Sequence, residues 1–286
     1  MSRAAPILKR SSYMFTRRTT RRFFILRPDK TKKSQDLFLY CLAVAAQRYG
    51  VEVHAVCVMS NHFHVVLSDP WGLLPSFKQM IVHQLANATK VLRGWPEEVF
   101  NKSNRTHVEL GGTTGLVHEI AYTIANPVDC GAVRTPENWP GVITLVKDIG
   151  RRVIKVRRPD YYFDPKALDK DGNIKWPEEI ELRILMPKAL LDKHEGDLEA
   201  AQDEIQTELD KQLRAARKKH RENGTFIGNA SRVMRQKLTR RGSAWETYGA
   251  LNPRIATGGD KELAQHLLDR YRAFWAAYVL APALPP

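Results

Sequence analysis

The stretch VEVHAVCVMSNHFHVVLSDP, residues 51–70, decides the fold of this chain. Both halves have strand character, and the polar Ser-Asn step between them supplies turn chemistry, so we expect an antiparallel hairpin. Because side chains alternate faces along a strand, His62 and His64 project from one face while Phe63 points into the other. This histidine pair could share one metal ion, although two structural or solvent-facing histidines would give the same pattern.

The segments around the hairpin predict a layered α+β domain that extends to about residue 134. We expect two short strands within residues 12–25, helices over 32–50, 72–92 and 115–126, and a loop over 93–114. The strands are expected because Tyr, Phe, Thr and Ile favour a pleated surface, and the helices because apolar residues recur at helical spacing. This order favours helices on one face of a mainly antiparallel sheet.

The composition changes beyond this domain. We expect two strands around a loop within residues 150–190, a charge-rich helix over 197–222 and an amphipathic helix over 260–279. We therefore divide the chain into a domain over residues 1–145 and a mostly helical, basic C-terminal extension over 146–286. The extension is expected to bind DNA or to pack on the domain.

Charge is the strongest global signal in the sequence. The chain has 45 Lys and Arg against 31 Asp and Glu, a formal net charge of +14, which favours a polyanionic partner such as nucleic acid over a membrane surface. Two runs hold the excess, and a solvated face is the alternative for each. The residues that we expect to contact DNA are Arg17, Arg18, Arg21 and Arg22 in the first run and Arg232, Arg235 and Lys237 in the second.

Cysteine usage and hydropathy limit the remaining classes. The three cysteines are widely spaced, which argues against a disulfide framework or a thiolate zinc site. No apolar run approaches the length needed to span a bilayer, and the N-terminus lacks the apolar core of a signal peptide. We expect an intracellular protein without a membrane partner.

The segment GLVHEIAYTIANP, residues 115–127, carries the second set of chemical groups. His118, Tyr122 and Asn126 are spaced by four residues and line up on the polar stripe of a helix. An oxygen of Asn126 could reach an ion held by the histidine pair, and an ion such as Mg²⁺ or Mn²⁺ would keep positions open for phosphate oxygens. A phenol becomes an effective nucleophile when a base takes its proton or a metal polarises the phosphorus. The alternative for Tyr122 is a core ring with its hydroxyl at the edge, and His118 is a bystander or a phosphate contact.

These motifs resemble a known family. MSNHFHVV resembles the His-hydrophobe-His motif of one-tyrosine HUH transposases, and AYTIANPVDCGAV resembles their tyrosine segment; the subgroup is the REP-associated tyrosine transposases. The resemblance covers about residues 10–145, including NWPG, which is similar to a Trp-Pro pattern of the family. Asp129 departs from the family's tyrosine segment, because members often carry a basic residue at this position. A DNA contact at this position is therefore not expected.

The resemblance implies a ferredoxin-like or RRM-like sheet and a catalytic domain over residues 1–145. It places the catalytic tyrosine on Tyr122 and the metal ligands on His62, His64 and Asn126. It also implies attack on single-stranded or hairpin DNA, a 5′-phosphotyrosine intermediate and a released 3′-hydroxyl that rejoins strands. A cytoplasmic, nucleoid-associated protein of a prokaryote, monomeric or homodimeric, is the matching expectation.

Two other classes remain open from the residues. A non-catalytic module that binds hairpin DNA, derived from such a transposase, would not need the histidine pair, Tyr122 and Asn126 together. A metallohydrolase that uses a metal-bound water would need the histidines only, and it would form no covalent adduct.

Overall fold

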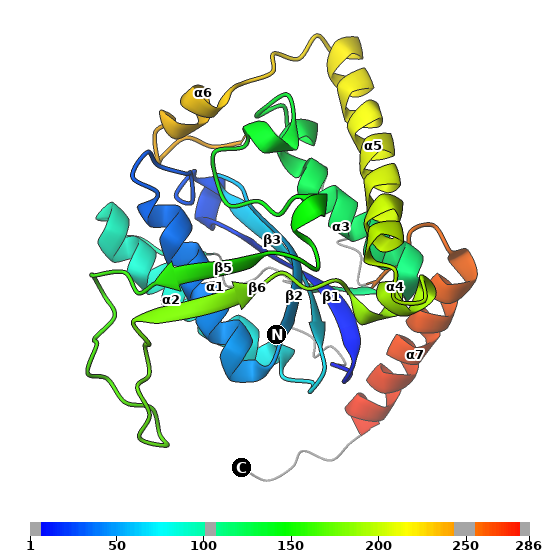
Figure 1. Ribbon diagram of the computed structural model, residues 1–286, viewed down its shortest axis with the longest axis horizontal. Helices are drawn as coiled ribbons and strands as arrows, with labels where there is room; N and C mark the ends of the chain where they lie inside the picture. The colour runs from blue at the N-terminus through cyan, green and yellow to red at the C-terminus, as the bar shows by residue number, and fades with distance from the viewer. Residues whose placement is uncertain (1–6, 101–106, 243–254, 281–286) are drawn as a thin grey trace.

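A five-stranded sheet lies at the centre of the computed structural model, which describes residues 7–100, 107–242 and 255–280 (Figure 1). Its strands are β1 (Ser11–Arg18), β2 (Glu52–Val58), β3 (His62–Asp69), β4 (His107–Leu110) and β7 (Ile255–Ala256). The strand order is β2-β3-β1-β4-β7. The first four strands pair antiparallel with one another, and β7 pairs parallel with β4 at the edge. The α+β class is confirmed, with a mixed rather than purely antiparallel sheet.

The chain order of the first six elements produces a split βαβ arrangement. The helices involved are α1 (Lys33–Tyr49) and α2 (Leu74–Arg93), and α3 (Gly112–Asp129) follows the last strand of this arrangement. A run of β1-α1-β2-β3-α2-β4 with the sheet order β2-β3-β1-β4 is the ferredoxin-like topology. The hairpin expected from residues 51–70 is formed by β2 and β3.

The helices cover both faces of the sheet, so the expectation of helices on one face was wrong. Phe63 contacts Phe38 of α1, with ring centroids 5.1 Å apart, and α2 packs beside α1. The adjacent His64 points the other way and meets Tyr122 of α3. Both sets of β3 side chains are buried, and a strand that is buried on both faces needs a covering layer on each.

The turn after β1 differs from the expected pair of strands. β1 continues through Arg18, and a 3-10 turn, η1 (Thr20–Arg22), follows it. Arg21 and Arg22 have φ values of 52° and 59°, which turn the chain out of the sheet instead of letting it return as a second strand.

The expected loop over residues 93–114 contains β4. This four-residue strand pairs with β1 and completes the ferredoxin-like sheet. Four residues are too few for alternation to stand out in the sequence. Residues 101–106 of the same segment lie outside the described residues.

The C-terminal part packs on the domain through a continuous hydrophobic core. Its elements are η2 (Pro136–Asn138), η3 (Val146–Asp148), β5 (Val153–Arg157), β6 (Glu179–Arg183), α4 (Lys188–Lys193), α5 (Leu198–Glu222), α6 (Ala230–Met234) and α7 (Lys261–Leu280). The β5-β6 hairpin lies on α1, and α5 runs along α3 (Figure 1). Ile205, Leu209 and Leu213 of α5 belong to the same buried cluster as the sheet. The division at residue 145 stays a prediction.

The segment that contains NWPG covers the open edge of β2. Trp139 Nε1 donates to the Val58 carbonyl oxygen over 3.0 Å, and the Val58 amide donates to the Val142 carbonyl over 2.9 Å. The Thr144 amide continues this pairing with a 2.8 Å bond to the Val56 carbonyl. The backbone groups of this edge strand are therefore satisfied next to the β2-β3 turn.

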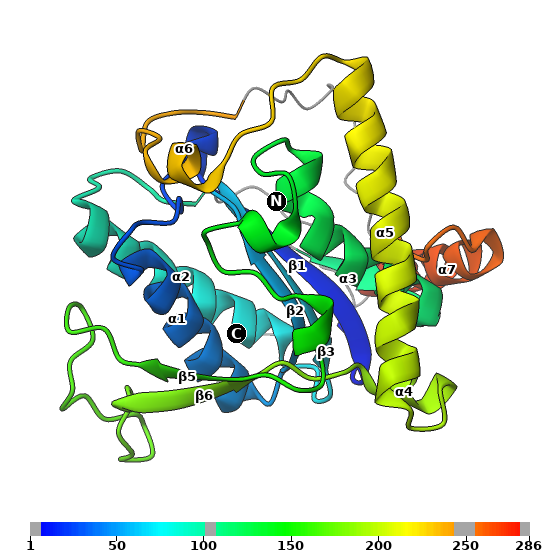
Figure 2. The ribbon, with the colours of Figure 1, turned by 45° about the horizontal axis from the view of Figure 1, so that its top comes forward.

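Residues 226–242, here called the strap, contain α6 and cross the end of the sheet where β3 begins (Figures 1 and 2). Arg27 Nη1 donates to the Met234 carbonyl oxygen over 2.7 Å. Ser60 Oγ, in the β2-β3 turn, donates to Gln236 Oε1 over 3.4 Å. The strap therefore lies beside the start of β3, although the two are about 170 residues apart in sequence.

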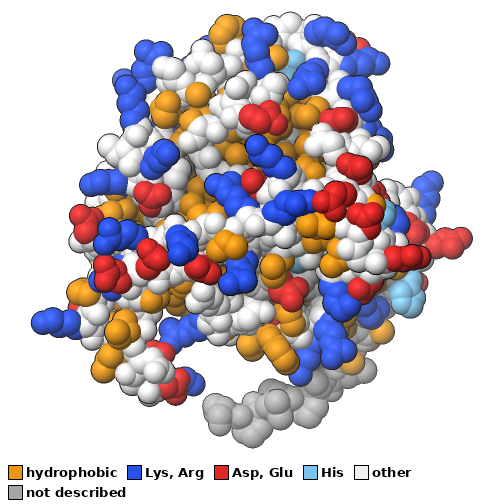
Figure 3. Space-filling model, viewed as in Figure 1, with side chains coloured by type: hydrophobic (Ala, Val, Ile, Leu, Met, Phe, Trp, Pro, Cys, Tyr) orange, Lys and Arg blue, Asp and Glu red, His pale blue; other side chains and the backbone are white. Residues whose placement is uncertain are grey.

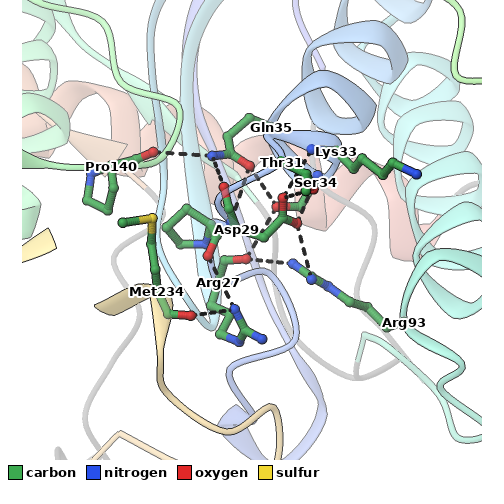
Figure 4. A network of polar contacts seen from close by, with 10 residues as sticks. Arg27, Asp29, Thr31, Lys33, Ser34, Gln35, Arg93, Pro140 and Met234 are labelled. Atoms are coloured by element: carbon green, nitrogen blue, oxygen red, sulfur yellow. Dashed lines mark hydrogen bonds and ion pairs between the residues drawn. The ribbon is translucent and has the colours of Figure 1, made fainter. Parts of the chain in front are cut away.

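A half-buried polar network fixes the residues to which the strap is attached (Figure 4). Arg93 Nη2 donates to the Arg27 carbonyl oxygen over 2.6 Å, and Arg93 Nη1 lies 3.2 Å from Asp29 Oδ2. Gln35 Nε2 donates to the carbonyl oxygens of Asp29 and Pro140, each over 3.2 Å. This network joins the N-terminal segment, α1, α2 and the edge-covering segment at the end of the sheet that carries the histidine pair.

Candidate active site

The histidine pair lies at the start of β3, on the face that α3 covers. The rings of His62 and His64 are 4.9 Å apart between centroids and nearly perpendicular, at 86°. His64 is buried, with 5% of its surface exposed, and His62 is half-buried. The shared face that alternation required is therefore observed, and α3 makes it a partly enclosed site.

Each imidazole is oriented through its Nδ1 atom. His62 Nδ1 lies 2.7 Å from Asn61 Oδ1, and Asn61 Nδ2 donates to the Arg22 carbonyl oxygen over 3.4 Å. Because the amide nitrogen of Asn61 is used elsewhere, its oxygen accepts from His62 Nδ1, which leaves the lone pair on Nε2. His64 Nδ1 lies 2.8 Å from Thr16 Oγ1. A partner on the second ring nitrogen fixes the orientation of an imidazole, as it does in metal sites.

Both histidines are held in the neutral form that binds metals. Burial and the charge of Arg18 lower the pKa of His62 to about 4. Burial, the neighbouring His62 and Arg18 lower the pKa of His64 well below its ordinary value. At neutral pH a lone pair is therefore available on each ring.

Helix α3 brings Tyr122 and Asn126 to the histidine pair. The Tyr122 ring lies 5.5 Å from the His64 ring between centroids, at 81°. Asn126, one turn later, raises the pKa of His62 and lowers that of Tyr122, which places its side chain near both. The spacing of four residues thus places an amide beside the phenol, as the polar stripe of the helix predicted.

The phenol of Tyr122 is protonated at neutral pH. Burial raises its pKa, and the charges of Glu119 and Asp129 add to this effect, whereas Arg18 and Asn126 oppose it. A protonated phenol is a weak nucleophile, so attack requires that its proton be removed as the new bond forms.

The residues present fit a divalent cation. His64 Nε2 and Asn126 Oδ1 are buried and have no hydrogen-bond partner among the described residues. An unpartnered buried acceptor costs about 1–3 kcal/mol, and a cation would satisfy both. The described part of the chain holds no cluster of three or more His, Cys, Asp or Glu. An ion here would therefore rest on two imidazoles and an amide oxygen, with further positions for water or substrate.

The structure separates the arginines of the first basic run. Arg18 pairs with His62 in the β1-β3 register and shares the histidine face. Arg17 points to the opposite face by alternation. Arg21, exposed at 60% of its side chain, lies 3.9 Å from Glu97, and Arg22 ends η1. Arg17 and Arg18 therefore lie on opposite faces of the sheet, and the expected DNA contacts of the four arginines stay a prediction.

The second basic run is brought to the same end of the molecule. Arg232, Arg235 and Lys237 are exposed on the strap, and the strap contains no Asp or Glu. In Figure 3 Lys and Arg gather over the end that carries α6 and the C-terminal end of α5, whereas both signs of charge mix over the lower half. No helix in the described ranges is long and apolar enough to cross a membrane.

Two other residues singled out in the sequence face α5. His118 Nδ1 lies 3.2 Å from Glu119 Oε1, and the His118 carbonyl oxygen accepts from Gln212 Nε2 over 3.1 Å. His118 is therefore not brought to the histidine pair. Asp129 lies 3.2 Å from Lys219 Nζ, so a base supplied by α5 offsets the acid that departs from the family pattern.

Sequence reasoning missed Thr16 and Asn61 as partners of the histidines. Asn61 directly precedes His62, but its residue type equally suits the turn in which it lies. Thr16 faces His64 because β1 and β3 pair in one register, and strand register across 48 residues leaves no local pattern in the sequence.

Two solved structures are similar to this chain. One is a REP-associated tyrosine transposase bound to a REP hairpin, 19% identical, with a TM-score of 0.43 over 52% of this chain and 84% of that chain. The other is a candidate transposase from Deinococcus radiodurans R1, 20% identical, with a TM-score of 0.28 over 36% of this chain and 82% of that chain. No protein-family model matches the sequence, and no curated protein matches it.

Proposed function

We propose that the protein is a metal-dependent nuclease and strand transferase that acts on single-stranded DNA. The observation that carries this proposal is the meeting of His62, His64, Tyr122 and Asn126 on one face of the sheet. More specifically, we propose a one-tyrosine transposase that cuts at a hairpin, REP-like DNA element. A module that only binds DNA has no use for a half-buried tyrosine beside two neutral, oriented histidines.

The residues divide the chemistry among them. His62, His64 and Asn126 would hold Mg²⁺ or Mn²⁺, which when bound polarises the phosphate and orients it for in-line attack. Tyr122 would attack the phosphorus, so that a tyrosine–phosphorus bond forms and the bond from phosphorus to the 3′-oxygen breaks. The phenol loses one proton and the departing 3′-oxygen gains one. Reversal by the 3′-hydroxyl of another strand would rejoin the backbone and release Tyr122.

The strap supports DNA as the substrate. Its exposed cations lie beside the β2-β3 turn, which directly precedes the histidine pair in β3. Cations without neighbouring acids suit a phosphate backbone, and their contacts position DNA without reading its sequence. We assign Arg232, Arg235 and Lys237 to the backbone flanking the cleaved phosphodiester.

Labelled hairpin oligonucleotides test this proposal. The purified chain is incubated with a 5′-labelled or a 3′-labelled single-stranded hairpin and Mg²⁺ or Mn²⁺, and the products are separated on a denaturing gel. A metal-dependent protein adduct that carries only the 3′-label is expected. Free 5′-phosphate products without an adduct would indicate a metallohydrolase, and binding without cleavage would indicate a hairpin-binding module.

Removing the partner of one histidine is expected to weaken the metal site without removing a ligand. Thr16→Val takes away the hydroxyl at His64 Nδ1 and keeps the side-chain volume. Loss of such a partner costs about 10–100-fold in metal affinity. Titration of Mn²⁺ followed by electron paramagnetic resonance measures it. Thr20→Val is the matched control, since Thr20 Oγ1 has no hydrogen-bond partner among the described residues; equal affinities in the two variants would contradict the role given to Thr16.

Neutralising the strap is expected to weaken DNA binding and its dependence on salt. Changing Arg232, Arg235 and Lys237 together to Ala should reduce the slope of log K against log[salt] by about 2–3, near one for each lost phosphate contact. Fluorescence anisotropy with a labelled hairpin over a salt series measures the slope. The control changes Lys155, Arg157 and Arg183, which are exposed on the β5-β6 hairpin. An equal effect of both triple variants would mean that only net charge matters.

A further inference from the structure

Arg18 lies on the histidine face at the end of β1. It is the register partner of His62, and Thr16, two residues earlier on the same strand, contacts His64. Residues two apart in a strand share a face, so Arg18 projects toward the layer that α3 fills. Its charge acts on three members of the site, because it lowers the pKa of His62, His64 and Tyr122.

The other side chains of the site do not supply positive charge. His62 and His64 are neutral, Asn126 is an amide and Tyr122 is a phenol, while the charges of Glu119 and Asp129 raise the pKa of the phenol. A phosphodiester that enters this site is anionic, and negative charge spreads over its non-bridging oxygens when a fifth oxygen approaches phosphorus. A guanidinium fixed by a strand is well suited to such oxygens, since it donates two parallel hydrogen bonds in a rigid fork.

We propose that Arg18 is a further catalytic residue, which donates to a non-bridging oxygen of the cleaved phosphate and stabilises the five-coordinate transition state. This inference rests on the proposed function and gives Arg18 a role beyond general contact with DNA. Arg18 takes no part in the transfer in which the phenol loses a proton and the 3′-oxygen gains one. Its immediate neighbour Arg17 cannot share the role, because it faces α1 and α2.

Single-turnover cleavage with saturating protein separates this role from binding. Arg18→Ala is expected to cleave about 10²–10³-fold more slowly, the usual effect of removing one donor to an oxyanion. Arg18→Lys, which keeps the charge but not the fork, should recover part of the rate, and added guanidinium should partly rescue Arg18→Ala. Hairpin affinity, measured by anisotropy, should stay within about threefold, because one surface contact of many is lost. Arg157→Ala, remote and 77% exposed, controls for the loss of one positive charge.

A methylphosphonate at the cleaved position gives a second readout. This analogue replaces one charged oxygen with a methyl group, so a residue that neutralises that oxygen becomes nearly dispensable. The cleavage rate of the unmodified chain should therefore exceed that of Arg18→Ala by about 10²-fold or more on the phosphate substrate. On the methylphosphonate substrate the difference in rate should be less than about 10-fold. A purely structural role would lower both rates equally and would overturn the inference.

The outcomes for Arg18 and for the proposed function are distinguishable. If the unmodified chain forms the adduct and Arg18→Ala cleaves as fast as Arg157→Ala, only the inference on Arg18 fails. A slower rate explained entirely by weaker hairpin binding would also overturn it. If the unmodified chain forms no adduct on any hairpin with either metal, the proposed function fails and the inference fails with it.

Discussion

Tyr122→Phe is expected to remove the covalent protein–DNA adduct completely and to slow cleavage of a hairpin oligonucleotide by about 10⁴-fold or more. The substitution deletes one oxygen, the atom that would bond to phosphorus, and removal of a nucleophile has effects of this size. The ring that packs 5.5 Å from His64 is retained, so the fold should be unaffected. The measurement is a denaturing gel with 3′-labelled DNA, together with the thermal unfolding midpoint of each protein.

The matched control for this variant is another tyrosine. Tyr162→Phe removes a phenol oxygen that is bonded to Gln84 on the far side of α2, and it should leave the adduct unchanged. Hairpin binding by Tyr122→Phe should also be unchanged, because the strap is intact. Cleavage by Tyr122→Phe at the normal rate would exclude the tyrosine mechanism and would point to attack by a metal-bound water.

His64→Ala is expected to lower Mn²⁺ affinity by more than about 100-fold and metal-dependent cleavage by at least about 10²-fold. The change removes one of three proposed protein ligands. Metal affinity should therefore fall further than it does when only the hydrogen-bond partner of a ligand is removed. His62→Ala should behave in the same way. Electron paramagnetic resonance of Mn²⁺ measures binding in the absence of DNA, so the result does not depend on activity.

His118→Ala controls for loss of an imidazole, since His118 lies against Glu119 on the α5 side of the helix. Its Mn²⁺ affinity and cleavage rate should equal those of the unmodified chain. Unchanged Mn²⁺ binding by both His62→Ala and His64→Ala would show that the pair does not hold the ion. In that case the two rings would be structural, the alternative that the pattern itself left open.

Local periodicity explains why several parts of the site could be predicted. Alternation along one strand puts His62 and His64 on one face, and the helical repeat puts Tyr122 and Asn126 on one stripe. Both are properties of a single element, so no knowledge of packing is needed. The ferredoxin-like sheet was implied by resemblance, and the observed strand order agrees with it.

Other features required contacts between distant segments. The short strand β4 lacks a periodic signal, and the placement of α3 opposite α1 and α2 follows from burial of both faces of β3. The opposed directions of Arg17 and Arg18 follow from β1 continuing through both residues.

The sequence by itself determined which chemical groups this protein has available: two histidines on one strand face, a tyrosine and an amide one turn apart, and an excess of bases in two runs. Only the tertiary structure decided which of them meet. The register of β1 and β3 brings Thr16 and Arg18 to the histidines, and the strap is fixed beside them by bonds to Arg27 and Ser60. The physical reason is that side-chain direction is set by the local backbone repeat, whereas register and docking depend on burial summed over the whole core.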